Sequence, residues 1–413
     1  MVHRVWNGQA HMPSVMDSQI EIVRGEGAYV WDSQGKKYLD GSASLWHANI
    51  GHGRKELAEA AHRQMLELET YHTFGRFINE PARTLADRLA AMSPIENPKV
   101  IFNSGGSDAI DVACKLARRY WQAVGHTERT VIVSRDTSYH GLHAFGTAIA
   151  GLEPNREGYG TESLVPDTAR VSANDPAKLE EQILALGPER IAAFVAEPVI
   201  GAGGVIGPAD GYFETVQRLA KEHGFLFIAD EVITGFGRTG KMFASERYSL
   251  DPDIHTMAKG LTSGYAPLGG IQIAERVWEP FFTGGKDAPA FRHGVTYSGH
   301  ATACAVAHAN LDVLEREDLV ERAGKLEDVL ADELDALRDV DGIVEVRSRA
   351  GFLGAVAFAE GIVNETIVRR VEDRGVILRA LPGNALQISP PFVAEPEDLA
   401  HTATAIREAV EGG

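Results

Sequence analysis

Residues 225–240 read FLFIADEVITGFGRTG, and their order predicts the central part of an α/β sheet. The first five residues are apolar and follow Gly224, a typical helix-ending residue, so they predict a short buried strand that ends directly before Asp230. A second short apolar run, at 254–258, ends directly before Lys259. Because ligands of open α/β sheets gather outside the carboxyl ends of the strands, this carboxylate and this amine predict a binding site.

The same pair of side chains is what pyridoxal phosphate chemistry requires. A lysine forms a Schiff base with the cofactor aldehyde, and an acid pairs with the protonated pyridine nitrogen, so that the ring accepts electrons. The carboxylate has to be ionised, and the lysine has to be neutral when it attacks, which requires a lowered pKa. Asp230 alone could cap a turn and Lys259 alone could be a solvated side chain, so the prediction also needs a phosphate site.

A glycine-rich turn supplies that candidate phosphate site. Residues 102–109 read FNSGGSDA; they complete the expected strand at 100–103 and open a helix whose apolar stripe begins at Ile110. The amides of a helix N-terminus attract anions, and Gly106 and Ser107 place bare backbone and a hydroxyl donor there. The simpler alternative is an ordinary turn with Ser107 as N-cap. No Lys-Ser or Lys-Thr pair follows the glycines, so the turn is not a Walker A loop.

A third turn follows the expected strand at 131–134 and reads Tyr139-His140-Gly141. The flat ring of Tyr139 is suited to stack on a planar cofactor. His140 could act as a base, but a hydrogen-bonded structural histidine is the more common role for such a residue.

The pattern of elements predicts an α/β protein of two domains. Short apolar strands alternate with long helices after about residue 98, which is typical of a mostly parallel sheet flanked by helices. An alternating meander at 20–40 and an α+β stretch after residue 300 would form a smaller domain from both termini. We expect a large cofactor-binding domain at 59–304 and a small domain made of 1–58 and 305–413. Expected strands lie at 100–103, 131–134, 191–196, 225–229, 254–257 and 268–273, and one long helical stretch at 301–340.

Composition limits the choice of partners and compartment. The 413 residues carry 40 Lys and Arg against 58 Asp and Glu, a net charge of −18 that argues against nucleic acid and anionic membranes as partners. Cys114 and Cys304 fall in apolar helical patterns, which predicts buried thiols in a reducing compartment and neither a disulfide nor a metal site. No signal-like segment and no apolar run of membrane-spanning length is present, so we expect a cytoplasmic enzyme.

A rival motif, GAGGVIG at 201–207, resembles the dinucleotide fingerprint of NAD-dependent dehydrogenases. The match is poor, because Ile206 stands where a small third residue is required, and Pro208 and Asp210 intervene before the helix. A dehydrogenase is therefore the runner-up from another cofactor class. A non-enzymatic assembly protein is a weaker alternative, because it needs no aligned glycine turn, aspartate and lysine.

Together these motifs resemble the class III aminotransferases, which are fold-type-I pyridoxal phosphate enzymes with a mostly parallel seven-stranded sheet. The resemblance covers nearly the whole chain and implies a homodimer with shared active sites; whether dimers pair into tetramers stays open. The matching stretches are 39–53, 105–109, 139–141, 196–199, 230–240, 252–254, 258–260 and 296–300.

The resemblance implies a role for each residue of the cofactor site. Lys259 would carry the Schiff base and shuttle the proton, and Asp230 would hold the pyridinium. Thr296 would reach the phosphate of the neighbouring subunit. Gly106 and Ser107 would hold the chain's own phosphate, Val232 and Tyr139 would pack on the two ring faces, and Glu197 and His140 would lie beside the cofactor.

Within the class, the chain is similar to the ω-amine:pyruvate group at Trp46, Phe74 and Arg379. Trp46, Phe74 and Tyr139 would wall an apolar pocket for the amine, and Arg379 would form a bidentate pair with the carboxylate of a keto acid or amino acid. A surface salt bridge is an equally weighted alternative for Arg379.

The function that follows is a ping-pong transfer of an amino group from an ω-amino acid or primary amine to pyruvate or a similar keto acid. Three other aminotransferase activities stay open, namely those on 4-aminobutyrate and ornithine and the one that forms diaminopelargonate. An intramolecular aminomutase stays open as well.

Overall fold

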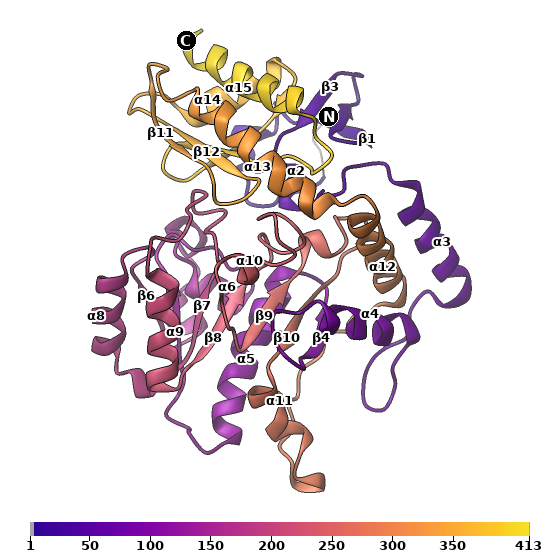
Figure 1. Cartoon of the computed structure of the whole chain (residues 1–413), viewed down its shortest axis with the longest axis vertical. Coiled ribbons are helices and arrows are strands. Elements are labelled where there is room, and N and C mark those ends of the chain that lie inside the picture. The colour runs from indigo at the N-terminus through magenta and orange to yellow at the C-terminus, as the bar shows by residue number, and fades with distance from the viewer. Residues whose placement is uncertain (1–3, 413) are drawn as a thin grey trace.

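The structure of the protein is a computed structural model, which describes residues 4–412. A seven-stranded sheet forms its centre, in the order β4-β10-β9-β8-β7-β5-β6, with β10 antiparallel to both of its neighbours and the other adjacent pairs parallel (Figure 1). The strands are β4 (Lys99–Asn103), β5 (Val131–Arg135), β6 (Thr168–Val171), β7 (Ile191–Ala196), β8 (Leu226–Asp230), β9 (Ile254–Met257) and β10 (Gly269–Ile273).

Six of these strands confirm the sequence prediction to within one residue at either end. The strand β6 was not predicted. Its four residues include the charged Arg170, so it lacks the continuous apolar run that marks the other strands. It pairs with β5 and forms one edge of the sheet, so its other side has no neighbouring strand in this sheet.

Helices cover both faces of this sheet, which explains why a central strand such as β8 is apolar at consecutive positions. In β8, Leu226 and Ile228 pack with α5 (Gly106–Ala123) on one face. Phe227 and Ala229, which alternate with them, pack on the other face with α8 (Pro176–Leu186) and α9 (Tyr212–His223). Every residue of β8 is therefore buried, and Asp230 is held at its end.

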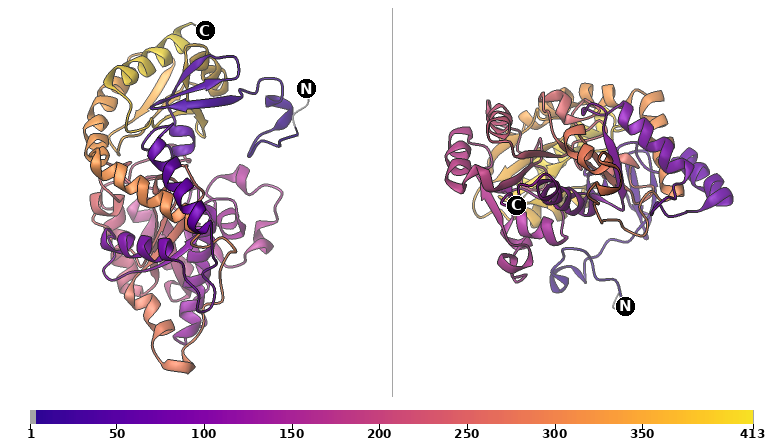
Figure 2. Two further views of the ribbon diagram at one scale, coloured as in Figure 1. Left: turned by 90° about the vertical axis from the view of Figure 1, so that its right-hand side faces the viewer. Right: turned by 90° about the horizontal axis from the view of Figure 1, so that it is seen from below.

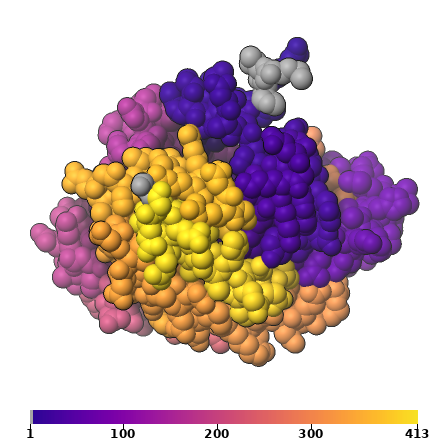
Figure 3. Space-filling model, turned by 90° about the horizontal axis from the view of Figure 1, so that it is seen from above, coloured from indigo at the N-terminus to yellow at the C-terminus, as the bar shows by residue number. Residues whose placement is uncertain are grey.

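The two ends of the chain build the smaller part of the molecule together. Strand β13 (Val376–Ile377) pairs in parallel with β3 (Lys37–Asp40) and so joins a C-terminal strand to the N-terminal meander. Figure 3 shows the N-terminal and C-terminal segments packed side by side on this end of the molecule. The other strands of its two sheets are β1 (Ile22–Glu26), β2 (Tyr29–Asp32), β11 (Ile343–Arg347), β12 (Gly354–Phe358), β14 (Arg379–Leu381) and β15 (Ala385–Ile388).

The expected helical stretch at 301–340 consists of two helices, α12 (Ala301–Arg316) and α13 (Leu319–Asp335), and the second helix ends five residues before the predicted end. The chain turns at Asp318, which adopts a left-handed conformation with φ 50°. Aspartate tolerates this conformation better than most residues. The break at Asp318 was not predicted, because the apolar helical pattern continues on both sides of it. The predicted domain boundaries fall inside α3 (Lys55–Leu68) and α12 and stay predictions.

The remaining helices lie around these two parts, and Figures 1 and 2 show α11 projecting at the end of the molecule opposite the C-terminus. No helix of the described residues is long and apolar enough to cross a membrane. Both cysteines are buried free thiols, as predicted. The remaining helices are α1 (Met12–Val15), α2 (Ala43–Trp46), α4 (Glu80–Ala91), α6 (Ala144–Ile149), α7 (Thr161–Leu164), α10 (Ala244–Arg247), α11 (Glu275–Phe282), α14 (Asn364–Asp373), α15 (Pro396–Glu411) and the 3₁₀ turns η1 (Glu153–Asn155), η2 (Pro188–Arg190), η3 (Lys259–Leu261) and η4 (Gly285–Asp287).

Candidate active site

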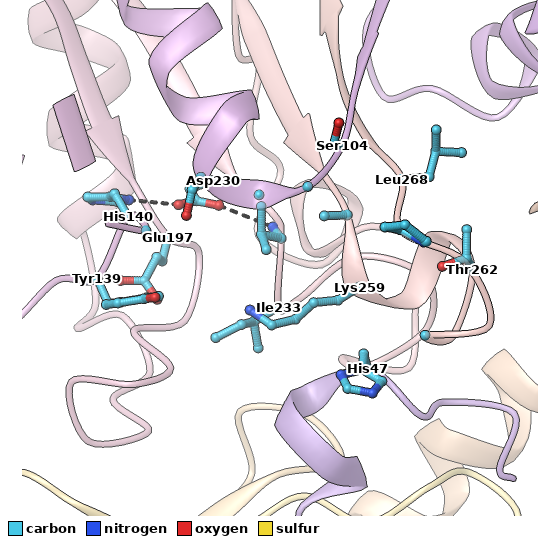
Figure 4. A pocket seen from close by; sticks show the side chains of 18 of the residues that line it. His47, Ser104, Tyr139, His140, Glu197, Asp230, Ile233, Lys259, Thr262 and Leu268 are labelled. Atoms are coloured by element: carbon cyan, nitrogen blue, oxygen red, sulfur yellow. Dashed lines mark hydrogen bonds and ion pairs between the residues drawn. The ribbon is translucent and has the colours of Figure 1, made fainter. Parts of the chain in front are cut away.

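A cavity of about 390 Å³ lies where the carboxyl ends of β5, β7, β8 and β9 meet the start of α5 (Figure 4). It brings together residues as far apart in the sequence as His47 and Leu268, as expected for ligands at the carboxyl edge of a parallel sheet. Eight residues predicted from the sequence line it: Gly106, Ser107, Tyr139, His140, Glu197, Asp230, Val232 and Lys259.

Asp230 is the buried anion of this cavity. Its Oδ2 accepts a hydrogen bond from Nδ1 of His140 at 2.7 Å, and its Oδ1 accepts from the hydroxyl of Thr256 at 3.0 Å and from the amide of Val232 at 3.1 Å. Burial raises the pKa of Asp230, but His140, the Val232 amide and the charge of Lys259 outweigh this, so the pKa lies below its ordinary value. The carboxylate is therefore ionised at neutral pH.

Lys259 follows β9 in a strained turn, with φ 40°. Only glycine fits at the next position, because a Cβ on Gly260 would lie 2.5 Å from Nδ2 of Asn49. Burial lowers the pKa of Lys259 to about 8, against the opposing charges of Asp230 and Glu197, and the charge of Arg379 lowers it further. A useful fraction of the amine is therefore neutral near neutral pH, as an attacking amine requires.

The start of α5 forms an anion cradle beside these two residues. Gly106 has no room for a side chain, since a Cβ there would lie 2.8 Å from Cγ1 of Val232. Gly141 has φ 82°, and a Cβ on it would collide with Ser107. The hydroxyl oxygen of Ser107 accepts from the amide of Leu142 at 3.2 Å, which leaves the hydroxyl proton free to donate to an anion.

Glu197 holds the turn that carries Tyr139. Its carboxylate accepts from the amide of Tyr139 at 3.0 Å and from the amide of Gly201 at 2.9 Å. Burial raises the pKa of Glu197 despite these two bonds. Gly203 packs against the same turn, because a Cβ on it would collide with the carbonyl of Thr137. Gly201 packs against Ile233, where a Cβ would collide with Cδ1. Packing therefore explains the glycine-rich stretch that resembled a dinucleotide fingerprint.

The four other predicted site residues do not line this cavity within one chain. Trp46 is buried in an apolar cluster with Val199 and Ile233. Phe74 and Thr296 are exposed on neighbouring loops. Arg379 starts β14 and is half-buried, and its charge affects the pKa values of Tyr139 and Lys259. The substrate roles of these residues, and that of Thr296 toward a neighbouring subunit, stay predictions.

Sequence reasoning missed several residues of the site, among them Thr256 and His47. Thr256, which donates to Asp230, lies directly opposite it in the parallel register of β8 and β9, and this register depends on the pairing of two strands that are distant in the sequence. His47 lines the cavity from the turn that follows α2, and no local sequence signal distinguishes it from its neighbours. Its position depends on how the two parts of the molecule pack.

An ionised carboxylate, an amine of lowered pKa and an anion cradle around one cavity, on a sheet of this topology, define a pyridoxal phosphate enzyme of fold type I. The family model for class III aminotransferases matches residues 12–410, and the chain belongs to this family. When bound, pyridoxal phosphate supplies an aldehyde that condenses with amines and a ring that accepts electrons. The donor set of the cavity fits this group.

Comparison with known proteins agrees with this family membership. The chain is 36% identical to putrescine–pyruvate aminotransferase of Pseudomonas aeruginosa over 94% of the chain and 90% of that protein. It is 34% identical to diaminobutyrate–2-oxoglutarate transaminase of Halomonas elongata over 92% of the chain and 87% of that protein.

Solved structures give the same result. A transaminase from the marine bacterium Virgibacillus superposes with a TM-score of 0.93 at 36% identity, covering 99% of this chain and 97% of that one. A PLP-bound amine transaminase from an uncultivated Pseudomonas species superposes with a TM-score of 0.94 at 35% identity, covering 99% of each chain.

Proposed function

We propose that this aminotransferase moves an amino group from a primary amine or ω-amino acid to pyruvate or a similar keto acid, in two alternating half-reactions. The observation that carries the proposal is that Arg379 is half-buried and has no carboxylate partner among residues 4–412. This guanidinium is half-buried near Lys259, and among residues 4–412 no carboxylate pairs with it. An unpaired, half-buried arginine beside a reactive lysine is suited to a substrate carboxylate.

The surroundings of Arg379 support this assignment over a surface salt bridge. Burial lowers the pKa of Arg379, and among residues 4–412 the opposing effect comes from Tyr139, which lines the cavity. A keto acid or an amino acid would supply the missing anion. An amine without a carboxylate does not need Arg379 for binding, so one site can accept both kinds of substrate in turn.

In this proposal, each residue of the cavity has a specific role in proton transfer or cofactor binding. Neutral Lys259 removes a proton from the substrate carbon and returns it during the transfer. Asp230 keeps its negative charge at the ring nitrogen, and His140 holds Asp230 in place through the bond to its Oδ2. Gly106 and Ser107 would hold the phosphate, and Val232 and Tyr139, which also line the cavity, would pack against the ring.

A homodimer would complete the site, with Thr296 reaching the partner's phosphate and Trp46 and Phe74 walling the amine pocket. Two loops, at 71–79 and 296–300, support this part of the proposal. The side chain of Asn79 ties them together by donating to the carbonyls of Tyr71 and Gly299. They present an exposed apolar surface of the kind that protein contacts cover, made of Tyr71, Phe74, Phe77, Ile78 and Tyr297.

The proposed location is the cytoplasm. Both cysteines are free thiols, which suits a reducing compartment.

The proposal is tested by a donor screen on the purified holoenzyme, with alanine formation from pyruvate as the readout. Primary amines and ω-amino acids are supplied one at a time, with and without pyruvate. We expect at least one donor to give alanine only when pyruvate is present. Rearrangement of a donor without any keto acid would instead identify an aminomutase, and alanine from no donor would contradict the proposal.

Replacing Arg379 by alanine is expected to raise the KM for pyruvate by about 10- to 100-fold, the effect of losing a hydrogen-bonded charged partner. The KM for an arylalkyl amine should change by less than about threefold, because that substrate has no carboxylate. Steady-state kinetics with each substrate varied in turn measure both values. Arg369→Ala, an exposed arginine on α14, is the matched control. Equal changes in both KM values would favour the salt-bridge role.

A further inference from the structure

The short turn η3, which Lys259 opens, is strained. Lys259 has a φ of 40°, a left-handed conformation that residues other than glycine rarely adopt. A residue keeps such a conformation where the surrounding structure fixes it, and strain of this kind gathers at functional sites. The contacts that fix the turn therefore help to determine where the amine of Lys259 lies.

Asn310, a buried residue of α12, is hydrogen-bonded to this turn. Its side-chain Nδ2 donates to the carbonyl of Gly260 at 2.8 Å and to the carbonyl of Leu261 at 3.1 Å. Both of these residues are buried as well, so water cannot replace the donor. A side-chain amide buried among apolar residues of a helix costs free energy unless it is hydrogen-bonded. The bonds that offset this cost go to the two residues that directly follow Lys259.

Asn49 packs against the same turn. A Cβ on Gly260 would lie 2.5 Å from Nδ2 of Asn49, so there is no space between the two residues. Asn49 is itself held in place, because its Nδ2 donates to the carbonyl of Phe236 and its Oδ1 accepts from Nη2 of Arg238, both at 3.1 Å. The backbone of Gly260 is therefore packed at its Cα and hydrogen-bonded at its carbonyl by Asn310.

We propose that Asn310 is a positioning residue, which keeps Lys259 in its strained conformation, with the amine in the cavity, by holding the carbonyls of Gly260 and Leu261. This inference rests on the role proposed for Lys259 and adds a residue that acts through it. Within residues 4–412 the lining of the cavity does not include Asn310, so its effect reaches the chemistry through the turn. Without these bonds the strain at Lys259 can relax, and a reacting group that moves by about 1 Å can lose about 100-fold in rate.

Hydrogen exchange of the turn tests the first step of this inference. Asn310→Leu keeps a side chain of similar size but has no donor. The holoenzymes of the wild type and the variant are compared by mass spectrometry of a peptide that contains residues 258–262. The amide of Leu261, which donates to the carbonyl of Ala258 at 2.8 Å, should exchange about tenfold or more faster in the variant, because the turn loses two hydrogen bonds.

Two further measurements on the same variant concern Lys259 directly. The first is the visible circular dichroism of the lysine-bound cofactor divided by its visible absorbance, which reports how firmly the cofactor is held in one orientation. This ratio should fall, although the cofactor stays attached. The second is kcat per attached cofactor, which should fall by about 10- to 100-fold. The KM values for the amine and for pyruvate should change by less than about threefold, because Asn310 touches neither substrate.

Asn364→Leu is the matched control. The Nδ2 of Asn364 also donates to two backbone carbonyls, those of Leu381 in β14 and Ala385 in β15, so this variant loses the same kind of bonds elsewhere. It should leave the exchange of residues 258–262 and the dichroism ratio as in the wild type. If Asn310→Leu does not fold, Asn310→Ser takes its place, because a serine inside a helix can bond to a carbonyl of its own helix and then does not hold the turn.

Unchanged exchange of residues 258–262 in a folded Asn310 variant would overturn the inference, and so would an unchanged dichroism ratio or an unchanged kcat per attached cofactor. Equal effects in Asn364→Leu would also overturn it, because they would reflect a general loss of stability. Failure of the role proposed for Lys259 looks different, because the wild-type enzyme itself would then carry no cofactor on that lysine.

Discussion

Replacing Lys259 by alanine is expected to abolish transamination, lowering kcat by at least about 10⁴-fold. The variant loses both the amine that attaches the cofactor and the group that moves the proton, and each of these is a large effect. The visible absorbance of the lysine-bound cofactor should disappear in the same variant. Alanine formation from pyruvate and an absorbance spectrum of the purified variant measure the two effects.

Lys241→Ala is the matched control, since Lys241 is an exposed lysine in the turn after β8. It should keep the activity and the spectrum of the wild type. A Lys259→Ala variant that retained full turnover would contradict the assignment of this residue, whatever its spectrum.

Replacing Asp230 by asparagine is expected to keep the cofactor attached while lowering kcat by about 10²- to 10⁴-fold. Asparagine has the same shape but no charge, so it cannot keep a ring nitrogen protonated, and Nδ1 of His140 loses its ionised acceptor. The visible spectrum reports attachment, and single-turnover kinetics with one amine donor report the rate.

Asp251→Asn serves as the control, because Asp251 is exposed and lies outside the cavity. Kinetics of the Asp230→Asn variant that match those of the wild type would remove Asp230 from the proposed role.

Much of the fold could be predicted because the central strands are buried on both faces. A strand such as β8 is apolar at four consecutive positions and ends in Asp230, so its position and its functional end are visible together in the sequence. Strand β6, with Arg170 and one neighbouring strand, lacks this mark. The reversed direction of β10 also depends on pairing with distant strands, which no local pattern encodes.

In the active site, too, some residues follow from local sequence patterns and others depend on tertiary packing. Lys259, Asp230 and Ser107 directly follow predicted strands or open a predicted helix, so their meeting at one edge of the sheet follows from the topology. His47 directly follows α2, whose conformation depends on the hydrogen bond between Asp40 and Ser44 and on the burial of Trp46, and no local pattern encodes these contacts. The predicted contribution of Thr296 involves a second subunit, so a single chain leaves it a prediction.

The central claim is that Lys259 carries the cofactor opposite the buried carboxylate of Asp230. Borohydride reduction of the holoenzyme, followed by proteolysis and mass spectrometry, tests this claim most directly, because reduction makes the link between the lysine amine and the cofactor permanent. The account predicts that the peptide containing Lys259 carries the added mass of the reduced cofactor and that no other lysine peptide does. An unmodified Lys259 peptide, or the added mass on a different lysine, would contradict it.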